Sequence, residues 1–286
     1  MAKQTPQTAP WSELGFVKQD VEERAETAIL MFEGWSSAPP VSTKQADRWL
    51  LVEQWVNNVH RVGWPTFTMG ALGYTIEHPV LQDWREAGRQ MVAADLYYFF
   101  GPWKNKKFVY YGGEVVDPEQ ARGRLKWINN YRESLMSALS LSDWKSAERL
   151  LEWPGPEVKE DQGLDNRTPE DNAYQIWLAM RLRGDSGSEV DARRDLISRR
   201  SRQRPKLLAL AADALFAGEP KQLAKTLADY LEYYRQREID LRRDPGERVV
   251  FQGICPEGTV LWHLARRRGL GEIELPKDLM IMIARP

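Results

Sequence analysis

The sequence contains a single cysteine, Cys255, in 286 residues. One cysteine cannot form an intramolecular disulfide, which excludes the small disulfide-stabilised scaffolds and fits a reducing compartment. Apolar runs are also short: the longest, residues 207–217, is broken by Asp213, whereas a membrane-spanning helix needs about 18 apolar residues. The N-terminal residues MAKQTPQTAPWSELG lack the apolar core of a signal peptide. We therefore expect a cytoplasmic protein.

Neither sign of charge is in excess. Lys and Arg number 40 and Asp and Glu number 41, which gives a formal net charge of −1. Such a chain has no global field that would attract a nucleic acid or an anionic membrane, so we expect neither as a partner. Tryptophan, in contrast, is abundant, with 12 residues. Large rings suit helix–helix contacts in a core, and the alternative is that a few exposed rings anchor a partner.

Residues that carry catalysis or bind metals are scarce. The three histidines are His60, His78 and His263, and none lies at ligand spacing from another His or from Cys255. No base that could activate Cys255 is marked by a sequence pattern, and neither a GxxxxGK phosphate loop nor a GxGxxG turn is present. We interpret His60, His263 and Cys255 as structural residues. The sequence therefore predicts no catalytic residue, no cofactor and no metal site.

One short motif has a misleading form. Residues 184–187, Gly-Asp-Ser-Gly, match the nucleophile turn of chymotrypsin-like proteases. The motif falls between two predicted helices, continues to Ser188 instead of a second glycine, and has no suitable upstream histidine. We interpret it as a turn.

Apolar residues recur at helical spacing along most of the chain. The pattern predicts helices at 17–32, 43–56, 81–99, 117–139, 142–151, 168–184, 188–196, 206–217, 221–238 and 257–268. Four of these start at capping residues, namely Asp117, Ser142, Thr168 and Ser188. Gly63, Pro65, Gly70 and Gly73 interrupt the stretch 62–79, which is therefore hard to assign.

Strand signals are confined to one segment, KKFVYYGGEVVDP. Two short β-prone runs flank Gly112–Gly113, so this segment is either a hairpin or a plain loop. The predicted fold is all-α, a multi-helix bundle or stacked antiparallel helical pairs with at most one short β-hairpin. We expect residues 1–10 to be a disordered leader and 11–286 to be a single helical domain, with a subdivision into 11–115 and 116–286 as the alternative.

Several residues are expected in the core of this domain because they repeat at helical spacing. These are Trp127, Ile128, Leu208, Ala212 and Leu215. The pair of helices at 206–217 and 221–238 is joined across Gly218, which predicts an αα-hairpin with small residues at the crossing. The apolar tail ELPKDLMIMIARP is expected to pack back on the body.

Two neighbouring segments differ sharply in charge. The segment 157–171 is polar and acidic, and its candidate partner-binding residues are Glu157, Glu160, Asp161, Asp165, Glu170 and Asp171. A basic run follows, with Arg193, Arg194, Arg199, Arg200, Arg202, Arg204 and Lys206. The two segments either neutralise each other or provide a docking surface. We take the acidic segment as the candidate docking site, because loops on a rigid scaffold commonly carry function.

The C-terminal part resembles the immunity protein 49 family of bacterial polymorphic toxin systems. The matching pieces are LLALAADALFAGEPKQLAKTLADYLEYYRQRE and EGTVLWHLARRRGLGEIELPKDLM, with DWKSAERLLEWP upstream, and the resemblance covers residues 125–286. It implies a cytoplasmic, non-catalytic protein that binds and neutralises a cognate toxin, and it transfers neither catalytic nor toxin-contacting residues. The alternative is a helical-repeat scaffold or adaptor unrelated to toxins, and a third hypothesis is an enzyme whose site no motif marks.

Overall fold

The computed structural model describes residues 48–73, 83–100, 128–152, 169–199, 202–240 and 252–285, the pairs 108–109 and 115–116, and scattered residues from 10 to 26. Over these residues the chain is all-α and 80% helical, so the predicted fold class is confirmed. None of the helices in this part of the chain has the length and apolar character needed to cross a bilayer.

The elements follow one another through short turns where the chain is described. The helices are α1 (Pro10–Glu13), α3 (Arg48–Ala71), α5 (Trp84–Phe100), α7 (Ile128–Ser140), α8 (Trp144–Leu151), α9 (Pro169–Arg183), α10 (Ser188–Arg199), α11 (Gln203–Ala217), α12 (Pro220–Tyr234), α13 (Pro256–Arg267) and α14 (Lys277–Met280). A π-helical segment, η2 (Arg235–Asp240), continues α12. Of the helix expected at 17–32, only residues 18–19, 21–23 and 26 are described, and all are helical.

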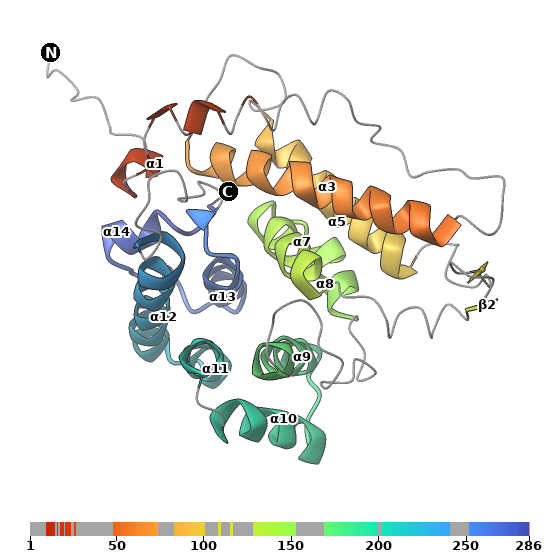
Figure 1. Ribbon diagram of the computed structural model, residues 1–286. Helices are drawn as coiled ribbons and strands as arrows, with labels where there is room; N and C mark the ends of the chain where they lie inside the picture. The colour runs from red at the N-terminus through yellow and green to blue at the C-terminus, as the bar shows by residue number, and fades with distance from the viewer. Residues whose placement is uncertain are drawn as a thin grey trace, which may run out of the picture.

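Helices adjacent in sequence pack in pairs: α3 with α5, α9 with α10, and α11 with α12. Figure 1 shows the helices from α9 to α13 following a curved path, with α13 returning beside α7. Helix α7 also packs against α5, so it connects the N-terminal pair to the C-terminal helices. The predicted stacking of helical pairs is therefore observed.

The prediction of an interrupted segment at 62–79 is wrong for residues 62–71, because α3 continues through Gly63, Pro65 and Gly70. A proline inside a helix removes a hydrogen bond and crowds the preceding turn. The hydroxyls of Thr66 and Thr68, which follow this proline, add side-chain hydrogen bonds to the carbonyls of Val62 and Trp64, both at 2.9 Å. The helix ends at Ala71, and Gly73 in the turn that follows has a φ of 78°.

The glycines of α3 bring two helices close together. A Cβ atom added at Gly63 would lie 2.8 Å from Met91 Cγ, and one added at Gly70 would collide with the Cβ and Cγ atoms of Trp84. Both neighbours belong to α5, where Gly88 in turn approaches Phe67 of α3. Close packing of α3 on α5 thus overrides the weak helix propensity of glycine.

We expect Gly70→Ala to lower the free energy of unfolding by about 1–3 kcal/mol, the usual cost of overpacking a core. The better helix propensity of alanine offsets only part of this cost. Urea unfolding followed by tryptophan fluorescence measures the change. Asn58→Ala, on the exposed face of the same helix, is the matched control and should change stability by less than about 0.5 kcal/mol. Equal stability of the two variants would contradict the close crossing.

The one strand pair is short. Residues Phe108–Val109 (β1) and Val115–Val116 (β2) pair antiparallel, with Val109 opposite Val115. The hairpin alternative is therefore the correct one.

Two helix starts can be compared with the predicted caps. Helix α8 is capped by Asp143, whose carboxylate accepts from the Ser146 N–H at 3.1 Å, and not by Ser142, whose φ is 58°. Helix α10 starts at the predicted place, with Ser188 as its first helical residue instead of the cap before it. The cap expected at Asp117 and the one expected at Thr168 lie outside the described residues.

The core of the C-terminal half agrees with the periodicity. Leu208, Ala212 and Leu215 are buried, whereas Trp127 lies outside the described residues and the side chain of Ile128 is not described. Gly218 closes α11 with a φ of 74°, and α12 follows at once, so the predicted αα-hairpin is confirmed. Every tryptophan whose side chain is described is buried or partly buried, which favours core packing over exposed anchors.

The C-terminal tail packs on the body, as expected. Leu279, Met282 and Ile283 are buried, and the Cys255 N–H donates to the Met282 carbonyl at 2.8 Å. His263 Nε2 donates to the Ala284 carbonyl at 2.9 Å, which gives this histidine the structural role predicted for it.

Candidate functional site

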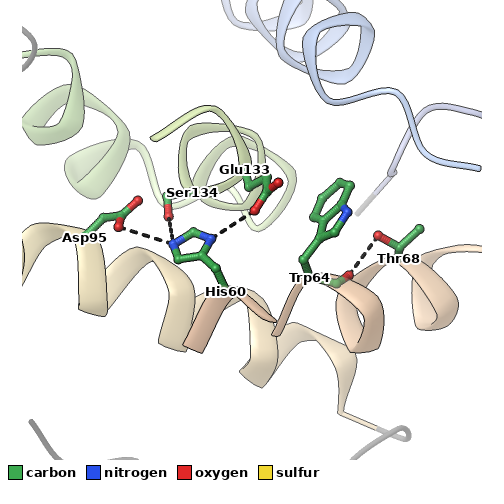
Figure 2. Close-up of polar contacts among 6 residues, drawn as sticks. All are labelled: His60, Trp64, Thr68, Asp95, Glu133 and Ser134. Atoms are coloured by element: carbon green, nitrogen blue, oxygen red, sulfur yellow. Dashed lines mark hydrogen bonds and ion pairs between the residues drawn. The ribbon is translucent and has the colours of Figure 1, made fainter. Parts of the chain in front are cut away.

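A buried polar network lies where α3, α5 and α7 meet (Figure 2). His60 of α3 is 5% exposed and places Nε2 3.2 Å from Asp95 Oδ1 of α5. Its Nδ1 lies 3.0 Å from Glu133 Oε2, and Ser134 Oγ lies 3.4 Å from Nε2, both on α7. The imidazole therefore joins three helices that are far apart in the sequence.

The protonation state of His60 decides what this network can do. Burial alone would lower the pKa of His60, but the charge of Asp95 and hydrogen bonds to Asp95 and Glu133 raise it to about 9. The ring is thus an imidazolium at neutral pH, and both of its nitrogens donate. A catalytic triad needs a neutral imidazole with serine and acid on opposite nitrogens. Ser134 and Glu133 do lie on opposite nitrogens, but Asp95 also contacts Nε2. A charged ring cannot accept the proton of Ser134, so the network fits an ion-paired structural site.

The two buried histidines predict opposite responses to pH. His60 has a pKa of about 9 when folded, so its stabilisation is complete below 6.5, its ordinary value, and is lost as the pH rises through 9. Burial lowers the pKa of His263 to about 4, so its contribution is present above 6.5 and is lost as the pH falls toward 4. Each shift corresponds to a change on the order of 3 kcal/mol.

The combined contribution of the two histidines to the free energy of unfolding is therefore expected to be largest near pH 6.5. The wild type should lose about 3 kcal/mol of that free energy between pH 6.5 and 9 through His60. Denaturant unfolding at both pH values measures this loss. His60→Gln, which cannot titrate, should lose markedly less over the same range. An identical alkaline slope for wild type and His60→Gln would show that His60 is not charged in the folded state.

A second polar cluster fixes α11 and α12 on α13. Glu257 of α13 is 4% exposed; its Oε1 accepts from Arg204 Nη2 at 2.7 Å and its Oε2 accepts from the Tyr230 hydroxyl at 3.2 Å. The Tyr234 hydroxyl lies 3.0 Å and 3.1 Å from the carbonyls of Gln252 and Ile254. Three elements are thereby locked together through charge-assisted hydrogen bonds.

Cys255 lies in the same region and is fully buried. Burial, and next the charge of Glu257, raise the pKa of its thiol to about 12. Because the nucleophilic form of cysteine is the thiolate, this thiol is unreactive while it stays buried. The structural interpretation of Cys255 agrees with this environment. Burial also raises the pKa values of Tyr174 and Tyr230, so both phenols stay protonated.

A groove of about 420 Å³ lies between α11 and α12 and is lined by sequence neighbours of Arg204 and Tyr230. Its lining residues are Gln203, Leu207, Asp229, Glu232, Tyr233, Gln236 and Arg237. We call this surface the α11–α12 groove. The lining residues from α12 and η2 recur at spacings of three and four residues, so these side chains share one helix face. The π-helical segment η2 lies at one end, and π-helical turns are frequent at functional sites.

The groove is next to the one exposed large hydrophobic residue in the described part of the chain. Leu210 of α11 is 48% exposed and follows Leu207 by three residues, which places both on one face. The groove was not predicted from the sequence. Its signal was present only as Leu210, an exposed leucine on a helix whose other leucines and phenylalanine are buried or partly buried.

The acidic residues singled out by the sequence are not brought together in the described structure. Glu157, Glu160, Asp161 and Asp165 lie outside the described residues. Glu170 and Asp171 lie in the first turn of α9, and their side chains are not described. The acidic segment therefore stays a sequence-based hypothesis.

The basic run is largely paired, but with partners elsewhere. Arg193 pairs with Glu189, Arg194 with Asp213, and Arg199 with Asp195, at 3.3, 2.6 and 3.0 Å. These partners belong to α10 and α11, and Arg204 pairs with α13. Among the described residues, the acidic partners of this run thus come from α10, α11 and α13, and none comes from 157–171.

Among the described residues, no group of three or more His, Cys, Asp or Glu side chains could hold a metal ion. The Gly184–Gly187 motif forms the turn between α9 and α10, with φ values of 84° and 103° at its two glycines. Comparison with known proteins identifies no relative: no family model, no curated protein and no solved structure matches this chain.

Proposed function

We propose that this chain is a non-catalytic binding protein that neutralises a cognate toxin by covering it with the surface of α11 and α12. The observation that carries the binding role is the α11–α12 groove, a concave surface with a partly apolar lining beside the exposed Leu210. Exposed apolar residues next to a recess with a polar rim are typical of protein–protein interfaces. The toxin as partner comes from the resemblance of residues 125–286 to the immunity protein 49 family.

The chemistry of the buried groups supports binding over catalysis. His60 is held as a cation between two carboxylates, and the thiol of Cys255 is held protonated. Neither group has the protonation state that a general base or a nucleophile needs. The described ionisable residues with large pKa shifts therefore stabilise the scaffold.

A scaffold or adaptor without a toxin partner is the second candidate. The stacking of consecutive helical pairs from α9 to α13 favours it, because such arrays present extended surfaces to many kinds of partner. The two candidates differ in the identity of the partner and not in the fold.

A co-expression experiment distinguishes a toxin-neutralising protein from a scaffold. The gene immediately upstream of this one is expressed in a bacterial host alone and together with the chain, and growth is measured. We expect growth arrest from the upstream gene alone, rescue on co-expression, and one complex of both proteins in size-exclusion chromatography. A chain truncated before α11 is the control for rescue. Arrest that persists on co-expression, with the two proteins eluting separately, would favour the scaffold.

A further inference from the structure

We infer that the α11–α12 groove receives a helix of the partner protein that presents a large apolar side chain between a basic and an acidic residue. This inference rests on the proposed function, since it specifies the chemistry of the partner that binding requires. It follows from three features of the groove: the apolar side chains in its lining, two exposed charges of opposite sign on its α12 and η2 wall, and the cluster that fixes its walls.

The groove has a mixed lining, in which Leu207 and Tyr233 are the two large apolar side chains among five polar or charged residues. Leu207 and Tyr233 are partly buried on opposite walls, and Leu210 continues the α11 wall with 48% of its surface exposed. A volume of about 420 Å³ lies in the range of small binding pockets and can accommodate a large side chain. Leu210 would lose its exposed apolar surface when a partner side chain enters beside it, which favours binding.

Two exposed lining residues, eight positions apart in the sequence, carry charges of opposite sign. Asp229 and Arg237 are both exposed, and within the described part of the chain neither forms an ion pair. Glu232, between them, is already bound to Arg235 at 2.6 Å. Eight residues along a helix correspond to about 12 Å. A partner helix with a base and an acid two turns apart therefore matches this pattern, with the base at Asp229 and the acid at Arg237.

The walls of the groove are held in place before binding. Arg204 follows Gln203 and Tyr230 follows Asp229, and both of these residues bind the buried carboxylate of Glu257. The two walls therefore keep their spacing without a partner. Binding to such a surface costs less ordering entropy than binding to a mobile one.

The test uses the full chain and two probes. The first is the purified product of the upstream gene. The second is a synthetic helical peptide that carries Arg, Leu and Glu at positions i, i+4 and i+8, labelled for fluorescence anisotropy. We expect Asp229→Lys and Leu210→Glu to weaken binding of either probe by about tenfold or more, since one close charge pair is worth at least about that factor. Asp191→Lys, an exposed acid of α10 outside the groove, is the matched control and should bind as wild type does.

A charge swap makes the test specific. A peptide with Glu in place of Arg should bind Asp229→Lys better than it binds wild type. Equal binding of the Arg peptide to wild type, Asp229→Lys and Leu210→Glu, or no binding to wild type, would overturn the inference. If all variants neutralise the upstream protein equally well, the groove is not the binding site, and toxin neutralisation stands as the function. If growth is not rescued while the peptide binds as described, the groove stands and toxin neutralisation fails.

Discussion

Asp95→Asn should lower the free energy of unfolding by about 3–5 kcal/mol, the cost of removing one partner from a buried ion pair. Asp95 is 1% exposed and its Oδ1 lies 3.2 Å from His60 Nε2. Asparagine keeps the shape and one acceptor but removes the charge that, after burial, contributes most to the pKa of His60. Thermal and denaturant unfolding at pH 7 measure the loss.

The matched control is Asp83→Asn, because Asp83 is 56% exposed and faces Arg89 at 3.4 Å in solvent. Exposed pairs of this kind are worth less than about 1 kcal/mol. The penalty of Asp95→Asn should also shrink above pH 9, where His60 is neutral in wild type as well. A penalty that is small at pH 7, or that does not change with pH, would contradict an ion-paired His60.

Leu215→Ala is expected to cost about 2–5 kcal/mol, as large-to-small changes in cores do. Leu215 is fully buried in the main core cluster and lies on the face of α11 that the sequence pattern assigns to the core. Leu210→Ala on the same helix removes the same atoms from an exposed position and should change stability by less than about 0.5 kcal/mol. Equal costs for the two variants would show that the buried face of α11 is wrongly assigned.

The sequence predicted those parts of the fold that local patterns determine. The helices from α8 to α13 follow from apolar spacing, and the turn at Gly218 from its backbone freedom. It failed at α3, since Gly63, Pro65 and Gly70 weaken a helix locally, while the close approach of the two glycines to α5 favours it. Such contacts depend on which helix packs alongside, and a single sequence does not show this.

The candidate sites were harder to predict from the sequence for the same reason. Asp95 lies 35 residues after His60, and Glu133 lies 73 residues after it. No sequence motif links residues that are so far apart. The α11–α12 groove depends on how two helix faces meet after folding. The acidic segment was chosen on composition alone, which indicates charge but not the surface to which it belongs.

The buried thiol of Cys255 gives the molecule a built-in reporter of its own opening. It is the one cysteine of the chain, and it lies at the N-cap of α13 beneath the tail. A thiol reagent can modify it only in molecules in which α13 or the tail has transiently separated from the body. Where reclosing is faster than modification, the labelling rate is proportional to the population of this open state and yields its free energy. A single alkylation time course would thus measure the local stability of α13 and the tail, without added labels.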